Sequence, residues 1–333
     1  MNDMNGMRAA DLVASLRESR GFRHKTDIAD VVGSLARRLP GGTHDLAQAV
    51  GLGDDCAALA DGDGYLLFAI EGMVSDFVGA MPWFAGYSSV MVNVSDIYAM
   101  GGRPLAVVDA LWSHGIAAAD QVLAGMAAAS VAYGVPIVGG HTNTRSDAAQ
   151  LAVSIIGRAK ALLSSFNAKP GDTLMMAVDL RGHFEEPYPF WNASVDAPSE
   201  RLRADLELLP QLAESGLCDA AKDISMAGTL GTALMLLECS QVGARIDLTR
   251  IPKPAGVTFS RWVTAFPSFG YLLSVRQDKV EAVQALFNSR ALACSAIGMV
   301  DDSLEVSLHQ QDDSAVLWDF RREPFIVAKD SPR

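Results

Sequence analysis

Residues Asn93–Pro104 read NVSDIYAMGGRP, and the prediction of the fold starts from this stretch. Its apolar residues continue a run that begins at Tyr87, with a spacing that favours a helix. The pair Gly101-Gly102, with Pro104 just beyond it, is a typical helix stop. The pattern therefore predicts a helix from about Tyr87 to Met100.

Two polar side chains of this helix are candidates for a site. Val90, Val94 and Ile97 share one helix face, and Asn93 and Asp96 lie together on its flank. Such a pair can present an amide and a carboxylate to one ligand. A solvated helix flank explains the same pattern equally well, and this segment alone does not distinguish the two.

Strands and helices alternate on both sides of this helix. The turn Asp61-Gly62-Asp63-Gly64 predicts a β-hairpin, and residues 105–111 and 173–178 have the pattern of strands. Helices are expected at residues 120–133 and 227–239. This alternation predicts an α/β or α+β fold.

The chain is long enough for two domains. A turn at Lys169-Pro170-Gly171-Asp172 opens the second half, so we expect a boundary near residues 160–168. The prediction is an N-terminal arm at residues 1–44, a first domain at 45–165 and a second domain at 166–333.

The composition provides ample apolar material for packed cores. Half of the 333 residues are hydrophobic, 20% are charged, and the net charge is −12. An acidic chain argues against nucleic acid and anionic lipid as partners, since both need a basic face. It can still bind a phosphate group if divalent metal ions lie between its carboxylates and the phosphate oxygens.

The sequence also predicts a cytoplasmic location. The four cysteines are far apart, which argues against a zinc framework and fits a reducing compartment. The N-terminus lacks the pattern of a signal peptide. The uncharged run Gln121–Gly140 could span a bilayer, but Gly134-Val135-Pro136 interrupts it, and a helix followed by a buried strand explains it better. We therefore expect no membrane partner.

Carboxylates recur at the ends of expected elements, beside glycine or other small residues. Gly53-Asp54-Asp55 suits a hard cation, although paired aspartates in turns are usually solvated. Glu71 follows the expected strand at residues 65–70, whose end could aim the carboxylate into a cleft. Asp223 precedes the helix at residues 227–239, and a simple N-cap role is its default interpretation.

A glycine pair is the candidate phosphate-binding feature. Gly139-Gly140 follows an expected buried strand and precedes His141 and Thr142. Consecutive glycines allow backbone N–H groups to approach a phosphate closely. A plain tight turn is an equally good explanation.

Taken together and in this order, these motifs resemble one family. The strings GDDCA at residues 53–57, NVSDIYAMGGRP at 93–104, YGVPIVGGHT at 133–142 and DIS at 223–225 look like the aminoimidazole ribonucleotide synthetase-related (PurM-like) superfamily. The resemblance covers roughly residues 45–300. Its closest motifs are those of thiamine-monophosphate kinase and selenophosphate synthetase.

The resemblance implies a two-domain PurM-like fold and a homodimer in which the N-terminal sheets of two subunits pair into a barrel. It also implies ATP as co-substrate and Mg²⁺ as cofactor, which matches the acidic composition. The metal ligands would then be Asp54, Asp55, Glu71, Asp96 and Asp223. Nucleotide or phosphate contacts would come from Asn93, Gly139, Gly140, His141, Thr142 and Lys25, the last of which lies in the arm.

The chain departs from the thiamine-monophosphate kinase pattern at three positions. It has Glu71 in an altered string, His141 where those kinases have aspartate, and Met226 in place of a second aspartate. The acceptor pocket therefore does not resemble one for thiamine monophosphate. Phe190 and Trp191, in a Pro-rich loop, could stack on a planar substrate, although packing onto their own domain is the simpler interpretation.

These observations predict a Mg²⁺- and ATP-dependent kinase or phosphate-activating synthetase that acts on a small-molecule acceptor. The sequence identifies no catalytic residue and does not choose between direct phosphoryl transfer and activation of an amide oxygen. The alternative is a non-catalytic nucleotide- or metabolite-binding homodimer on the same scaffold, which the changes at Glu71, His141 and Met226 would allow.

Overall fold

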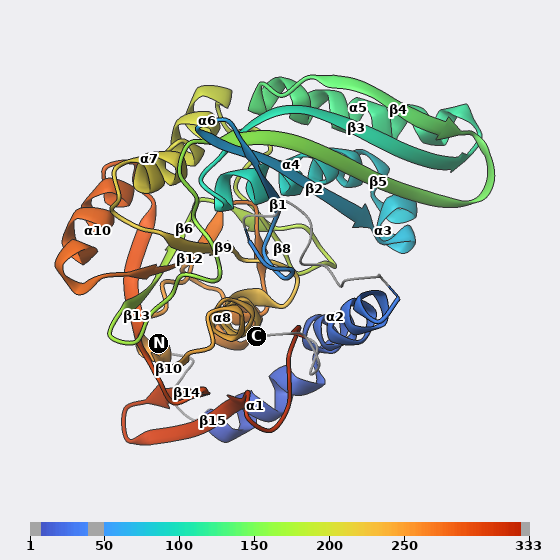
Figure 1. Cartoon of the computed structure of the whole chain (residues 1–333). Helices are drawn as coiled ribbons and strands as arrows, with labels where there is room; N and C mark the ends of the chain where they lie inside the picture. Colours follow the sequence, from blue (N-terminus) through green and yellow to red (C-terminus); the bar gives the residue numbers. More distant parts are fainter. Residues whose placement is uncertain (1–7, 39–49, 328–333) are drawn as a thin grey trace. The chain divides into compact units, whose positions relative to one another are not determined.

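The computed structural model describes residues 8–38 and 50–327, and its chain forms two compact units (Figure 1). The N-terminal unit consists of Asp55–Leu162 and Ser194–Glu214. The described residues of the C-terminal unit are 8–38, 50–54, Leu163–Ala193 and 215–327. Each unit is a mixed α/β structure, as the sequence predicts.

This division differs from the predicted domains in two places. The described part of the predicted arm, residues 8–38, and residues 50–54 of the predicted first domain belong to the C-terminal unit, whereas residues 194–214, which were expected in the second domain, belong to the N-terminal unit. These segments join a unit through tertiary contacts with residues far away in the sequence, which a linear pattern of turns does not reveal.

The N-terminal unit contains a five-stranded sheet in the order β1-β2-β5-β3-β4. Its strands are β1 (Ala57–Asp61), β2 (Gly64–Met73), β3 (Arg103–His114), β4 (Ile137–Asn143) and β5 (Arg145–Ala159). The β1–β2 hairpin closes at the predicted turn, where Asp61 pairs with Gly64. Strand β4 is an exposed edge strand and not the buried strand expected from its apolar start.

Five helices belong to this unit. They are α3 (Ser75–Ala80), α4 (Pro82–Ala99), α5 (Ile116–Tyr133), α6 (Ser199–Leu206) and α7 (Leu208–Glu214). One of them, α4, forms the interior of the unit with α5 packed against it. A Cβ atom at Gly86 of α4 would lie 2.0 Å from the Val122 carbonyl oxygen, and one at Gly125 of α5 would lie 1.9 Å from that of Trp83. Glycine at both positions therefore allows α4 and α5 to pack backbone to backbone.

Helix α5 is the one helix in the described part of the chain that is long and apolar enough to cross a membrane. Length and composition alone give this result, and a core helix of a globular protein gives the same one. Packing against α4 buries Val122 and Met126 of this helix, whereas Ile116 and Val131 are exposed.

The sheet of this unit has one covered face and one open face. On the covered face Leu67, Val107 and Val153 are buried, and α4 contacts β2, β3 and β5. On the open face Phe68 and Ile70 are 50% and 65% exposed. Alternation of this kind is usual in antiparallel sheets, but the outer face is normally polar, whereas this one is apolar.

The C-terminal unit contains a seven-stranded sheet in the order β15-β14-β10-β13-β6-β12-β9. The strands are β6 (Thr173–Val178), β9 (Ala220–Asp223), β10 (Gly243–Asp247), β12 (Gly270–Val275), β13 (Ala293–Asp301), β14 (Glu305–Gln310) and β15 (Asp313–Asp319). Helix α8 (Gly228–Cys239) is buried along its whole length, and its residues join the hydrophobic core of this unit.

Smaller elements complete the unit. Strands β7 (His183–Phe184), β8 (Phe190–Asn192) and β11 (Phe266–Pro267) form a three-stranded sheet within the predicted Pro-rich loop and beyond it. The remaining elements are α9 (Phe259–Val263), α10 (Val280–Asn288) and the 3-10 turns η1 (Leu248–Arg250) and η2 (Gln277–Lys279).

The predicted arm contains two helices, α1 (Ala9–Glu18) and α2 (Arg20–Ala36). The Arg17 guanidinium lies over the Trp318 ring at 4.2 Å, and Phe22 packs edge-on against Phe325 at 5.4 Å. These contacts make α1 and α2 part of the C-terminal unit.

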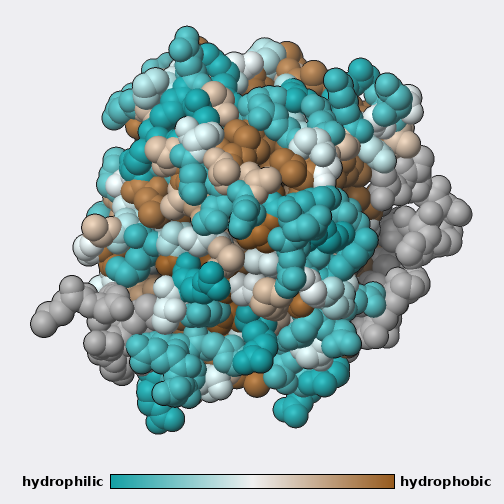
Figure 2. All heavy atoms as spheres, turned by 90° about the vertical axis from the view of Figure 1, so that its left-hand side faces the viewer, coloured by the Kyte–Doolittle hydropathy of each residue, from teal (hydrophilic) through white to brown (hydrophobic). Residues whose placement is uncertain are grey.

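On the face drawn in Figure 2, apolar side chains gather in a patch that polar side chains surround.

Candidate functional site

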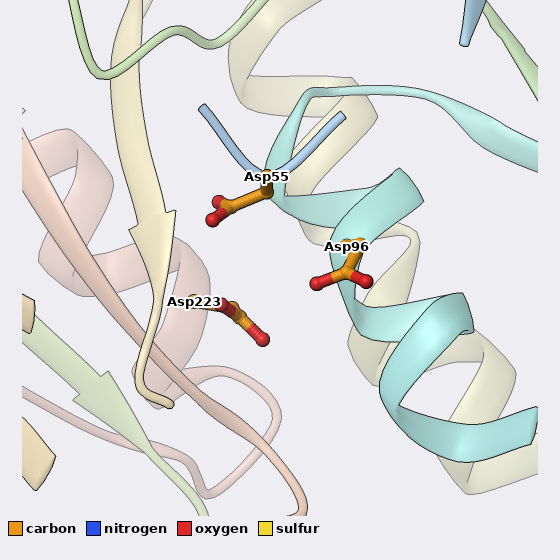
Figure 3. Close-up of side chains that lie close together, drawn as sticks. All are labelled: Asp55, Asp96 and Asp223. Carbon is orange, nitrogen blue, oxygen red and sulfur yellow. The ribbon is translucent and has the colours of Figure 1, made fainter. Parts of the chain in front are cut away.

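Asp55 and Asp96 form a carboxylate pair in the N-terminal unit. Asp55 lies in the loop before β1, and Asp96 lies in the last turn of α4. Each offers a carboxylate oxygen within 4.8 Å of the other's, and both side chains are drawn in Figure 3. Mg²⁺ is commonly held by one or two carboxylates together with phosphate oxygens. The pair therefore has the donor chemistry that a Mg²⁺ ion with bound phosphate requires.

Helix α4 places Asn93 and Asp96 in the interior, because its residues from Phe84 to Ala99 are all buried. The interpretation of these two residues as a solvated flank is therefore wrong. Asn93 Nδ2 donates a hydrogen bond to the Ser89 carbonyl oxygen at 2.8 Å. Among the described residues, no group donates to the buried Asn93 Oδ1. An amide oxygen of this kind can receive a cation or an N–H group.

Asp54 makes different contacts from its neighbour Asp55. Its Oδ1 accepts from Ser165 Oγ at 2.6 Å and its Oδ2 from Ser164 Oγ at 2.7 Å. The Ser165 N–H donates to both oxygens, at 3.2 and 3.1 Å. These contacts attach the Asp54 carboxylate to the segment before β6, so its role as a metal ligand stays a prediction.

Asp223 is the last residue of β9 in the C-terminal unit, and its side chain is buried. The N–H of Ile224 donates to the Gly270 carbonyl oxygen at 2.8 Å, which fixes the end of the strand. Helix α8 begins after Ala227 and has no side-chain cap, so the N-cap interpretation of Asp223 is wrong. Figure 3 labels Asp223 at the end of its strand.

Glu71 and His141 lie on opposite faces of the five-stranded sheet. Glu71 of β2 pairs in register with the buried Val153, which places it on the covered face. His141 of β4 pairs with Ala110, and its ring centre is 6.0 Å from that of Trp112, which places it on the open face. Within one chain, these two positions therefore do not line the same pocket.

The predicted glycine turn is part of a strand. Gly139, Gly140, His141 and Thr142 all belong to β4 and are exposed, so the interpretation as a tight turn is wrong. An edge strand keeps half of its N–H groups free of sheet pairing, which is compatible with phosphate binding. Their nucleotide contacts stay predictions.

Asp109 of β3 is a candidate that the sequence prediction missed. It pairs in register with both Val153 of β5 and Gly140 of β4. A Cβ at Gly140 would lie 2.2 Å from Asp109 Oδ1, so glycine is required beside this carboxylate. Burial raises the pKa of Asp109. The available signal was a lone aspartate inside the apolar run at residues 105–111.

The structure also locates the three remaining candidates, all in the C-terminal unit. Lys25 is half-buried on α2. Trp191 is 5% exposed, donates from Nε1 to the Asp179 carbonyl oxygen at 2.9 Å and packs edge-on against Trp262. The packing interpretation of Trp191 is therefore the one observed. Phe190 is half-buried and its substrate contact stays a prediction.

Comparison with known proteins relates this arrangement to one family. The family model "AIR synthase related protein, N-terminal domain" matches residues 53–159, and the corresponding C-terminal domain matches residues 171–310. An uncharacterized protein of Synechocystis sp. is 48% identical over 94% of this chain and 97% of its own length. The thiamine-monophosphate kinase of Synechococcus elongatus is 24% identical over 80% of this chain and 88% of its own length.

Two solved structures share the fold. T. maritima PurL complexed with ATP superimposes with a TM-score of 0.72 at 18% identity, over 97% of this chain. The chain spans 56% of that PurL chain. AaThiL complexed with AMPPCP and TMP has a TM-score of 0.61 at 17% identity, over 80% of this chain and 92% of its own.

The two domain matches lie in the same order as the predicted motifs, and the glycine-stopped helix α4 with its Asp96 falls inside the first of them. The chain therefore belongs to the AIR synthase related protein family, with the family's N-terminal domain followed by its C-terminal domain.

Proposed function

We propose that this chain is a Mg²⁺-dependent enzyme that uses ATP to phosphorylate or activate a small-molecule acceptor. The observation that carries the proposal is the carboxylate pair formed by Asp55, in the loop before β1, and Asp96, on the buried helix α4 of the family's N-terminal domain. Two carboxylates this close to each other provide the oxygen ligands that a divalent cation with bound phosphate prefers.

In this proposal Asp55 and Asp96 hold the Mg²⁺ ion, and the sequence resemblance assigns Asp223 as a further ligand. The ion supplies charge neutralisation for the ATP phosphates, which is the main requirement of phosphoryl transfer. Asn93 Oδ1 is an additional oxygen on the same helix, one turn before Asp96. Direct transfer to an acceptor and activation of an amide oxygen need the same arrangement, and both remain within the proposal.

The acceptor is proposed to differ from thiamine monophosphate. Glu71 lies on the covered face of the sheet and His141 on the open face. Within one chain, the two side chains therefore do not contact the same acceptor. The covered face holds a second carboxylate, Asp109, in the same cross-strand row as Glu71. Two neighbouring carboxylates bind an acceptor with N–H or O–H groups better than an anionic acceptor.

We also propose a cytoplasmic homodimer. The open sheet face exposes Phe68, Ile70, Val108 and Ile156, and burying apolar surface of this kind against a second copy would stabilise a dimer. The sequence resemblance implies the same pairing of sheets.

A thermal-shift titration with ATP and ADP, with and without Mg²⁺, tests the proposal on wild type and Asp96→Asn. A ligand at 100 times its Kd stabilises a fold by about 2.7 kcal/mol. We expect a Mg²⁺-dependent shift with ATP that Asp96→Asn loses. Asp120→Asn, on the exposed side of α5, is the matched control and should keep the shift.

Two results would contradict the proposal in different ways. A shift that survives in Asp96→Asn would remove Asp96 from the metal site. A Mg²⁺-dependent shift without turnover of ATP in the presence of any acceptor would favour a non-catalytic nucleotide-binding protein.

A further inference from the structure

Lys222 is a buried lysine that the proposed chemistry does not use. It lies on the edge strand β9 directly before Asp223, between residues that are buried like it, and it is 4% exposed. Burying an ammonium group costs several kcal/mol unless it is hydrogen-bonded or paired. The contacts of the Lys222 side chain must therefore offset the free-energy cost of burying its ammonium group.

The Lys222 ammonium group is bound to the turn that carries the first acidic motif. Its Nζ donates to the Gly53 carbonyl oxygen at 3.2 Å. Gly53 has φ +118°, a backbone conformation that other residues rarely adopt. The Cys239 thiol at the end of α8 also faces this carbonyl oxygen, with Sγ at 3.8 Å. The carbonyl group thus points into the C-terminal unit and is held by two side chains from different elements.

The next residue of the turn is held by a third segment. The Asp54 carboxylate accepts hydrogen bonds from Ser164 and Ser165, which precede β6. Gly51 lies against the Phe166 ring, where a Cβ would come within 2.8 Å. The turn before Asp55 is therefore fixed by residues that are more than 100 positions away in the sequence.

We infer that Lys222 is a positioning residue, which holds the Gly53–Asp54 turn so that the Asp55 carboxylate stands ready to bind a cation. The inference rests on the proposed function, since it assigns Lys222 a role toward the same carboxylates. Lys222 does this through its hydrogen bond to the Gly53 carbonyl oxygen.

The two possible roles of Lys222 predict opposite effects of its removal on the affinity for a divalent cation. Lys222 directly precedes Asp223, which the sequence resemblance assigns as a further ligand, and a positive charge beside a ligand weakens cation binding because like charges repel. If charge were the only contribution of Lys222, its removal would strengthen the binding of a divalent cation. If Lys222 positions the turn, its removal weakens that binding even though a repulsive charge has gone.

The experiment compares full-length wild type with Lys222→Met, using Mn²⁺ alone as the probe in calorimetric titrations. We expect the Mn²⁺ dissociation constant to rise by about tenfold or more, as for other residues that orient metal ligands. Hydrogen–deuterium exchange should be faster in peptides that cover residues 50–58. Lys253→Met is the matched control, since Lys253 Nζ also donates to a backbone carbonyl oxygen, that of Val257, at 2.7 Å.

Equal or tighter Mn²⁺ binding in Lys222→Met, with unchanged exchange at residues 50–58, would overturn the inference. If wild type binds no Mn²⁺, the proposed metal site fails, and the exchange measurement alone still decides whether Lys222 holds the turn. Lys222→Gln is neutral and too short to reach Gly53, and it replaces the methionine variant if that variant does not fold. Lys222→Arg keeps the donors and should remain close to wild type.

Discussion

At the scale of single residues, the half-buried Asp109 lowers the free energy of unfolding when its carboxyl group is ionised. Burial raises its pKa, which means that the folded chain binds the proton more tightly than the unfolded chain does. Stability therefore falls as the pH rises from the ordinary range of an aspartate through the raised folded pKa, and at neutral pH the ionised side chain destabilises the fold.

Asp109→Asn should therefore be more stable than wild type at neutral pH, because it removes the charge that burial disfavours. The difference should shrink as the pH is lowered, because protonation gives wild type a neutral side chain as well. Calorimetric unfolding between about pH 8 and about pH 5 measures it, with exposed Asp120→Asn as the control. A loss of stability in Asp109→Asn at neutral pH would mean that the carboxylate has a structural partner.

The thiols give a second prediction for single residues. Burial raises the pKa of Cys294 and of Cys218 to about 12. The thiolate is the reactive form, so both side chains should react very slowly with a disulfide reagent in the native protein at about pH 8. Counting reactive thiols with and without denaturant tests this, and rapid native labelling of Cys294 would contradict the buried position.

At the scale of elements, helix α4, which carries Asp96, packs closely against α5. A Cβ at Gly125 would lie 1.9 Å from the Trp83 carbonyl oxygen, so any side chain there must push α5 away from α4. Gly125→Ala should destabilise the protein by about 1–3 kcal/mol, although alanine is the better helix former. Gly79→Ala in α3 is the control, since its Cβ would meet nothing within 4 Å. Denaturant unfolding measures both, and equal effects would exclude the helix contact as the cause.

Helix α8 is joined to the segment after β15 through Glu238. Its carboxylate accepts hydrogen bonds from the N–H groups of Phe325, Ile326 and Val327, at 2.7, 2.7 and 3.1 Å. Glu238→Ala should cost at least about 2 kcal/mol, because it leaves these donors without their acceptor. Exposed Glu281→Ala is the comparison, and a similarly small loss in both would show that water replaces the carboxylate.

At the scale of the whole molecule, the open face of the five-stranded sheet determines the expected assembly. Phe68 and Ile70 are exposed on it, and a second copy of the chain is the proposed cover. Phe68→Glu should convert a dimer to a monomer, because burying an unpaired carboxylate in an apolar interface is costly. The control is Val131→Glu, since Val131 is also exposed but lies on α5, at 74% against 50% for Phe68. Sedimentation analysis of wild type and both variants distinguishes the sheet face from a general effect of charge.

The linear pattern determined the elements that carry the motifs. Gly101-Gly102 and Pro104 end α4 where expected, Asp61 and Gly64 close the hairpin, and the alternation of strands and helices predicts the class. These features depend on neighbours in the chain, and local backbone preferences are enough to specify them. The order of the motifs was also sufficient to predict the family that the domain matches show.

Only the tertiary structure decided how the acidic residues are used. Asp54 and Asp55 are adjacent in the sequence, yet Asp54 is bound by Ser164 and Ser165 whereas Asp55 pairs with Asp96. Strand register places Asp109 beside Gly140 and separates Glu71 from His141. Sheet order and helix packing set these contacts between residues that are distant in the sequence. No local preference encodes them, because the partners meet only when the apolar faces are buried.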